Sequence, residues 1–165
     1  MPDDPNDAER PAPVKEAPQG GGKPHPILER SRFVTEYVRR LTFNMLIGNA
    51  DMHMKNWSLI YPDRRYVSLA PAYDFVATVP YLPGDATNMK ISRAKVFSAF
   101  SVDELEHLAV KASIPRKMAI DAAKETVQAF REHWETEAAN LPMSDEVRSA
   151  VEAHMKTVPI LKELS

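Results

Sequence analysis

A cluster of polar side chains lies in the segment NADMHMKN (residues 49–56), between two apolar stretches of the sequence. The segment contains Asp51 and Asn56, and a second acid, Asp74, follows a further apolar run. One or two carboxylates and an amide oxygen, completed by water and phosphate oxygens, form the ligand set that Mg²⁺ prefers. A hairpin between Asn56 and Asp74 would bring their side chains together, so the sequence predicts a magnesium site here.

Two other kinds of site are disfavoured by the same residues. A zinc centre is usually built from several His and Cys ligands, but the sequence has no cysteine and no second histidine with usable spacing from His53. A hydrolase nucleophile of the G-x-S-x-G type is also absent from the sequence. The cluster therefore favours a hard cation with oxygen ligands.

The spacing of Asp51 and Asn56 matches the catalytic loop of protein kinases, H-R-D-x-x-x-x-N. In that loop the aspartate accepts the proton of the substrate hydroxyl and the asparagine holds a metal ion. A later aspartate holds the metal ion that joins the nucleotide phosphates. Asp51, Asn56 and Asp74 follow one another in this order. The order and spacing are those of a phosphoryl-transfer site.

The amino-acid sequences of two segments indicate a family more specifically than this spacing does. FNMLIGNADMHMKNWSL (residues 43–59), followed by LAPAYDFVAT (residues 69–78), resembles the C-terminal lobe of the HipA-like serine/threonine kinases. These kinases are the toxins of bacterial type II toxin–antitoxin pairs. The resemblance implies that Asp51 is the catalytic base, that Asn56 and Asp74 bind Mg²⁺, and that ATP is the second cofactor.

The resemblance also covers the other polar residues of the loop, through the pattern G-N-x-D-x-H-x-K-N-x-S. It implies that His53 and Lys55 belong to the catalytic loop, and that Lys55 contacts the γ-phosphate of ATP. Structural alternatives stay open for both, because His53 could brace the loop by hydrogen bonds and Lys55 could be surface charge. Asn49 and Asp51 could likewise close a turn, since short polar side chains bond to nearby backbone groups.

The elements that must position these residues are mostly helical. An apolar stripe at helical spacing predicts a helix over residues 27–47 that ends at Gly48, and the stripe consists of Val34, Val38, Leu41 and Met45. β-rich segments at 57–61 and 66–69, separated by the turn sequence PDRR, predict a hairpin. Tyr73 and Phe75 flank Asp74 and are expected to pack and fix its orientation.

Three helices are predicted after residue 101. Ser101 and Glu104 form a capping-box pattern for a helix to about Lys111, and a second apolar stripe predicts a helix from about 113 to 139. Ser144 caps the last predicted helix. We therefore expect a mainly α fold: a kinase-like C-terminal lobe of helices, with one small β-hairpin carrying the catalytic and metal-binding loops.

The composition limits the class of protein. A net charge of −2 and a pI near 6.2 argue against direct nucleic-acid binding. No apolar run approaches the ~20 residues that span a bilayer, so no membrane contact is expected. The lack of cysteine and of a secretory signal fits a cytoplasmic protein. Residues 1–26 are rich in proline and lack aromatic residues, which predicts a disordered tail before a lobe at 27–165.

A kinase also needs a glycine-rich loop that covers the phosphates and a strand lysine that pairs with them. Neither pattern occurs in this sequence, so we expect the isolated chain to be inactive. Three hypotheses follow: a split kinase that needs an N-terminal half in trans, a truncated remnant, or a binding module that engages a helix-turn-helix antitoxin or a protein substrate. The family resemblance suggests a Ser or Thr on a translation-related protein, such as an aminoacyl-tRNA synthetase, as the substrate.

Overall fold

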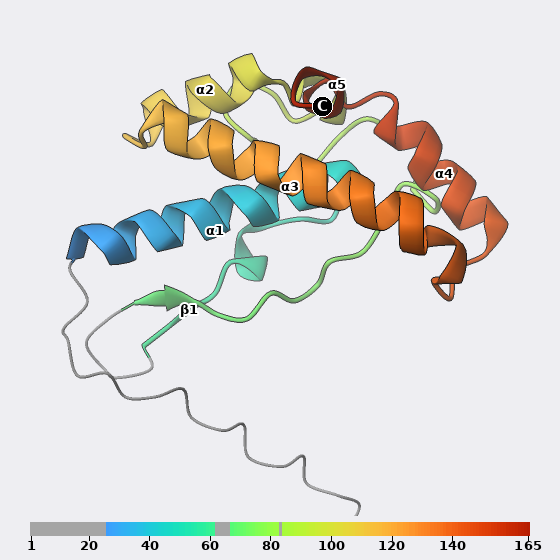
Figure 1. Cartoon of the computed structure of the whole chain (residues 1–165), viewed down its shortest axis with the longest axis horizontal. Coiled ribbons are helices and arrows are strands. Elements are labelled where there is room, and N and C mark those ends of the chain that lie inside the picture. Colours follow the sequence, from blue (N-terminus) through green and yellow to red (C-terminus); the bar gives the residue numbers. More distant parts are fainter. Residues whose placement is uncertain (1–25, 62–66, 83) are drawn as a thin grey trace, which may run out of the picture.

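The structure is a computed structural model that describes residues 26–61, 67–82 and 84–165. Figure 1 shows two long helices, α1 and α3, lying side by side, with the shorter helices along their flank. The predicted mainly helical fold is confirmed. The elements in chain order are α1 (Pro26–Ile47), η1 (Met54–Asn56), β1 (Leu59–Ile60), β2 (Ser68–Leu69), η2 (Phe97–Ala99), α2 (Val102–Lys111), α3 (Arg116–Glu137), η3 (Ala138–Asn140), α4 (Asp145–Met155) and α5 (Ile160–Glu163).

Helix α1 forms as predicted and begins one residue earlier, at Pro26, where proline is well tolerated because a first-turn N–H has no partner within the helix. Its stripe is buried at Val38, Leu41 and Met45, against small residues of α3 such as Ala123. Residues 1–25 of the predicted tail lie outside the described residues. No helix in the described ranges is long and apolar enough to cross a membrane.

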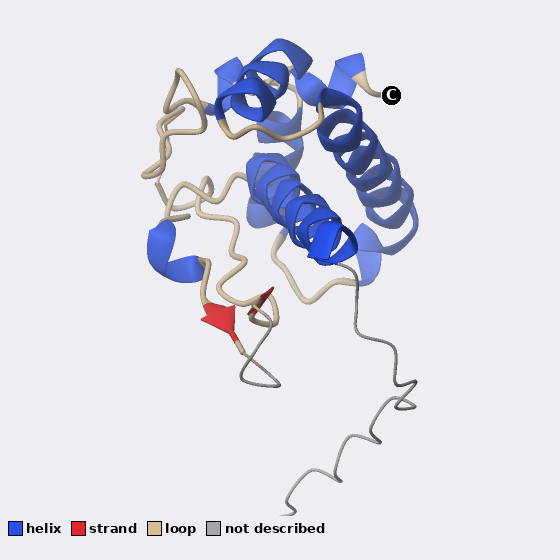
Figure 2. Ribbon diagram, turned by 90° about the vertical axis from the view of Figure 1, so that its left-hand side faces the viewer, coloured by secondary structure: helices blue, strands red, loops and turns tan. Residues whose placement is uncertain are grey.

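The hairpin is shorter than predicted. Within the described residues the hairpin consists of β1 and β2, which pair antiparallel with Leu59 opposite Leu69 and Ile60 opposite Ser68. Leu59 and Ile60 are exposed, so little burial supports a longer ladder. The predicted turn at 62–65 lies outside the described residues. Figure 2 shows the two strands at the edge of a body that is otherwise helix and loop.

The helix after Ser101 forms as predicted, but only half of the capping box does. The Ser101 hydroxyl accepts the N–H of Glu104 at 3.2 Å. The Glu104 carboxylate is instead occupied by the N–H groups of Ser92 and Arg93, at 3.0 and 2.6 Å, and by the Arg93 guanidinium. Burial alone would raise the pKa of this carboxyl, but the bonds from Arg93 and Ala94 outweigh burial and lower the pKa below its ordinary value.

Three helices were expected after residue 101, but the described residues contain four α-helices there, so the expectation is wrong. Helices α3 and α4 occupy the predicted segments, and Ser144 caps α4 by accepting the N–H of Val147. The described residues also contain α5, which has four residues and is too short to show an apolar period. Its Ile160 is buried and donates its N–H to the carbonyl of Phe100 at 3.0 Å, which fixes the C-terminal segment beside α2.

Candidate active site

The candidate site begins where α1 ends, at Gly48. This residue has φ +72°, a conformation that glycine adopts without strain. Its carbonyl accepts the N–H groups of Thr78 and Val79 at 3.1 and 3.2 Å. The Thr78 hydroxyl in turn accepts the N–H of Ala50 at 2.7 Å. The loop after α1 is thus fastened to the segment that follows Asp74.

A buried histidine supports the same helix end from behind. His154, on α4, donates its Nε2–H to the carbonyl of Met45 at 2.8 Å, and so satisfies one of the last carbonyls of α1. The His154 ring also meets Phe97 edge-on, with centroids 4.6 Å apart. Burial lowers the pKa of His154, and this outweighs the raising effects of the Met45 carbonyl and Asp85.

The lowered pKa of His154 makes the stability of the chain dependent on pH. The folded chain holds His154 neutral, so its contribution is fully present above the unfolded pKa of about 6.5 and is lost as the pH falls below that value. We expect His154→Gln to be destabilising by about 1 kcal/mol at pH 7.5, and this difference from wild type to shrink at pH 5.5. Urea unfolding of both proteins at the two pH values measures it. An equal difference at both would contradict the prediction.

The loop at residues 49–56, called here the catalytic-type loop, is held in part by its own side chains. Met52 is buried beneath it, and the amide oxygen of Asn56 accepts the N–H of His53 at 3.0 Å. The buried Nδ1 of His53 has no hydrogen-bond partner among the described residues, so the loop is braced through the backbone of His53 and not through that ring nitrogen. Lys55 is exposed, and its ammonium has no ion pair within the described part of the chain.

The structure brings Asn56 and Asp74 together. The side-chain amide of Asn56 donates a hydrogen bond to the Asp74 carboxylate, across 18 positions of the sequence. Asp74 has φ 61°, which is uncommon for a residue other than glycine. The preceding Tyr73 is exposed, and its hydroxyl bonds to Ser58 and to the carbonyl of Lys55. The expectation that Tyr73 packs is therefore wrong, because its hydroxyl finds partners on the facing loop.

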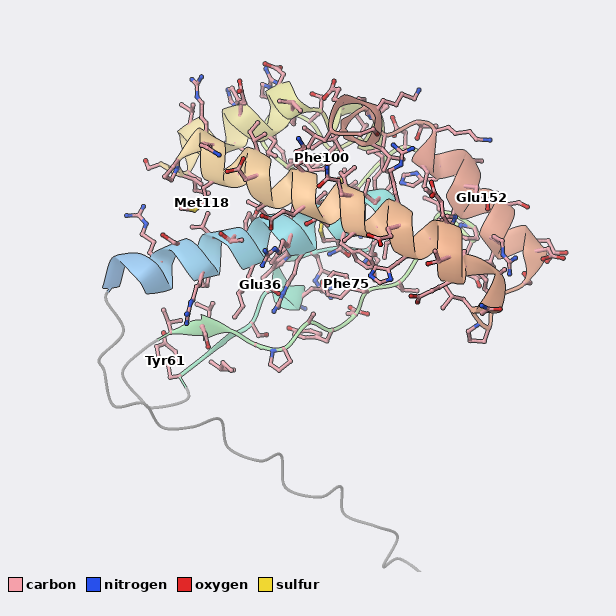
Figure 3. The ribbon with its side chains drawn as sticks, in the orientation of Figure 1. Glu36, Tyr61, Phe75, Phe100, Met118 and Glu152 are labelled. Carbon is pink, nitrogen blue, oxygen red and sulfur yellow. The ribbon has the colours of Figure 1, made fainter. Side chains whose placement is uncertain are left out.

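The residue after Asp74 anchors the same segment to the helices. Phe75, labelled in Figure 3, meets Phe43 of α1 edge-on with ring centroids 5.5 Å apart, as its predicted packing role requires. Phe43 in turn contacts Phe130 of α3 at 5.9 Å. Beside this row lies an apolar groove of about 1000 Å³. The basic side chains that line it, Arg39, Arg40 and His133, each face a carboxylate, so none of the three is free to bind a phosphate.

Asp51 is exposed and lies beside a residue that the sequence did not single out. Asn88 donates its side-chain amide to a carboxylate oxygen of Asp51 at 3.1 Å, and its N–H to the carbonyl of Ala50 at 2.9 Å. The backbone N–H of Asp51 is accepted by the side-chain oxygen of Asn49 at 3.2 Å. Asp51 is thus connected to the other candidate residues through Asn49, and among the described residues it forms no direct hydrogen bond to Asn56 or Asp74.

The donor set can be tested against a metal ion. The described residues contain no group of three or more His, Cys, Asp or Glu side chains that could enclose a metal. Mg²⁺ does not require one, since it keeps several waters and is bound through one or two carboxylates and phosphate oxygens. The exposed Asp74 carboxylate fits that kind of open site. The Asn56 amide lies beside it with its nitrogen toward Asp74 and its oxygen on the His53 N–H, so a metal would bind the remaining lone pair of that oxygen.

Comparison with a solved structure defines the class of fold. A HipA chain from the Shewanella oneidensis complex titled "Toxin Antitoxin System HipA, HipB and its operator DNA complex" superposes with a TM-score of 0.60. The match covers 79% of this chain and 30% of that chain, at 21% sequence identity. The fold of this chain is therefore similar to that of about a third of the solved chain.

The family follows from the sequence comparisons. The family described as "HipA-like C-terminal domain" matches residues 26–134, so the chain belongs to this family and the resemblance stated from the sequence is confirmed. "Putative kinase Y4dM" of Sinorhizobium fredii is 51% identical over 133 residues, covering 80% of this chain and 32% of the relative. A protein of Haemophilus influenzae named "Putative kinase" is 48% identical over 46 residues, covering 28% of this chain and 13% of the relative. The chain thus spans about a third of the length of the Sinorhizobium relative.

Proposed function

We propose that this chain is the catalytic C-terminal lobe of a HipA-like, ATP-dependent protein serine/threonine kinase, and that it needs a second, nucleotide-covering region for activity. The observation that supports this most is the contact between the Asn56 amide and the Asp74 carboxylate, which joins the loop to the segment expected to hold the metal. If Asp51 served only to close a turn, the Asn56 amide and the Asp74 carboxylate would not need to be in contact.

Each residue then has a distinct role. The Asp51 carboxylate, steadied by Asn88, orients the substrate hydroxyl and accepts its proton. Asn56 and Asp74 would hold Mg²⁺ through side-chain oxygens, and the exposed Lys55 would contact the γ-phosphate of bound ATP. When bound, Mg²⁺ neutralises charge on the phosphate oxygens as the phosphoryl group transfers. The ring of His53 completes the loop as a supporting group.

The comparisons support the context of this proposal. The two relatives described above both carry kinase names, and the structural neighbour was solved as a toxin–antitoxin complex with operator DNA. We therefore include in the proposal a cytoplasmic location, a helix-turn-helix antitoxin as protein partner, and a Ser or Thr of a protein as substrate. The chain itself makes no direct nucleic-acid contact in this proposal.

Transfer of radiolabel from ATP to a general kinase substrate protein tests the function. We expect no measurable transfer by the purified chain, because nothing in its sequence covers the phosphates. We expect transfer when the part of the Sinorhizobium relative not matched by this chain is co-expressed with it. Robust transfer by the chain alone would contradict the need for a second region. No transfer with that region, despite a stable complex, would favour the remnant or binding-module hypothesis.

A further inference from the structure

One buried side chain contacts both carboxylate-bearing segments of the candidate site. Asn49 is 2% exposed and follows directly after the turn at Gly48. Its side-chain amide nitrogen donates to the backbone carbonyl of Asp74 at 3.1 Å, and its side-chain oxygen accepts the backbone N–H of Asp51 at 3.2 Å. The two candidate functional acids are therefore linked through a single amide.

The same amide is also anchored to α1. Its nitrogen donates a second bond, to the side-chain oxygen of Asn44 at 2.7 Å. Asn44 is 5% exposed, and its own amide nitrogen donates to the carbonyl of Arg40 at 2.9 Å, one turn earlier in the helix. The positions of Asp51 and Asp74 are thus both tied, through Asn49, to α1, whose core-facing side is buried.

The hydrogen-bond inventory explains why asparagine stands at this position. Both amide protons of Asn49 face acceptors and its oxygen faces a donor, so each polar group is used. An aspartate here would direct a carboxylate at the oxygens of Asn44 and Asp74. An alanine would leave three buried or partly buried polar groups without this partner, and an unpaired buried polar group is destabilising.

We propose that Asn49 is a positioning residue for phosphoryl transfer, which sets the place of the metal-binding Asp74 relative to the base Asp51. This proposal rests on the proposed function for its chemistry, whereas the positioning itself is independent of it. Asp74 has φ 61°, a conformation that is unfavourable for L-residues. The bond from Asn49 to the Asp74 carbonyl helps to hold that conformation, and with it the direction of the carboxylate toward Asn56.

Three variants of the chain test the proposal: Asn49→Ala, Asn49→Ser and the control Val127→Ala. The serine variant keeps an acceptor for the Asp51 N–H but is too short to reach Asp74 as well, and it guards against misfolding of the alanine variant. Val127 is fully buried on α3, so its truncation lowers stability without touching the loop.

The first readout is the backbone conformation of Asp74 in NMR spectra. An intense cross-relaxation peak between its own amide and α-protons marks positive φ. We expect that peak to weaken in both Asn49 variants and to persist in Val127→Ala. A peak of unchanged intensity in both Asn49 variants, with unshifted amides at 73–75, would overturn the positioning role whether or not the chain binds metal.

The second readout is the affinity for Mn²⁺, used as a probe for Mg²⁺ and measured from free Mn²⁺ by electron paramagnetic resonance. Loss of a residue that orients a metal ligand typically weakens binding about 10- to 100-fold, which we expect for Asn49→Ala but not for Val127→Ala. Equal affinities in wild type and both Asn49 variants would overturn the role at the metal site. If wild type binds no Mn²⁺, the proposed function is contradicted, and the NMR readout still decides the positioning.

Discussion

Asp51→Asn and Asp74→Asn are each expected to abolish phosphoryl transfer by the complemented kinase, for different reasons. Asp51→Asn removes the group that accepts the substrate proton, which typically slows a reaction by about 10²–10⁴-fold. Asp74→Asn removes a negatively charged metal ligand. Its side-chain oxygen still accepts the bond from Asn56, so the local contact is kept while the charge is lost.

Initial rates of radiolabel transfer over a series of Mg²⁺ concentrations separate the two effects. High Mg²⁺ should partly restore Asp74→Asn, because weaker binding is offset by mass action, and should leave Asp51→Asn inactive. The matched control is Asp121→Asn, which removes one exposed carboxylate on α3 that pairs only with Lys117 among the described residues. Full activity in Asp51→Asn, or an equal loss in Asp121→Asn, would contradict the assigned roles.

Gly48→Ala is expected to have the largest effect on stability, about 2–4 kcal/mol. The positive φ of Gly48 costs an L-residue about 1–2 kcal/mol. A Cβ there would also lie 2.6 and 2.7 Å from the two methyl carbons of Val79 and 3.0 Å from His154, and overpacking of this kind costs about 1–3 kcal/mol. Urea unfolding, followed by circular dichroism, measures the change.

Two companion variants divide that loss into its causes. Gly84→Ala is a control for strain without overlap, in a different region of positive φ, since Gly84 has φ +153° and nothing lies within 4 Å of an added Cβ. Gly48→Ala combined with Val79→Ala removes the steric overlap and should recover part of the stability relative to the sum of the single changes. Additive losses in the double variant would show that the overlap is relieved in some other way.

The helices were predictable because their signals are local. The stripe of α1, the stop at Gly48, and the caps at Ser101 and Ser144 each depend on a few neighbouring residues, and all are found. The partner of the Glu104 carboxylate was not predictable, because Ser92 and Arg93 reach it only after the chain has folded. The predicted hairpin was longer than the observed one, because residues with high β-propensity do not lengthen a ladder when their side chains are exposed.

The candidate site was also predictable only in part. The order and spacing of Asp51, Asn56 and Asp74 identified the polar cluster, and the contact of Asn56 with Asp74 agrees with the hairpin expected between them. Two of the amides that hold the site, Asn44 and Asn88, were missed. Asn44 offered a signal, because it is a polar residue beside the apolar stripe of α1, and a buried amide must find partners. Asn88 offered none, since its contact with Asp51 joins residues 37 positions apart.

The packing of α1 on α3 also has a consequence for how the chain folds. The ion pair between Arg39 and Glu125 joins residues 86 positions apart, and the catalytic-type loop, the hairpin and the Asp74 segment all lie inside that interval. Closing so long an interval has an entropic cost that must be met before the two helices gain contacts. The segments of the site bury little apolar surface of their own, and contacts with α1 hold them in place. We therefore expect the site to form together with the docking of the two helices, and to have no stable precursor during synthesis until α3 has emerged.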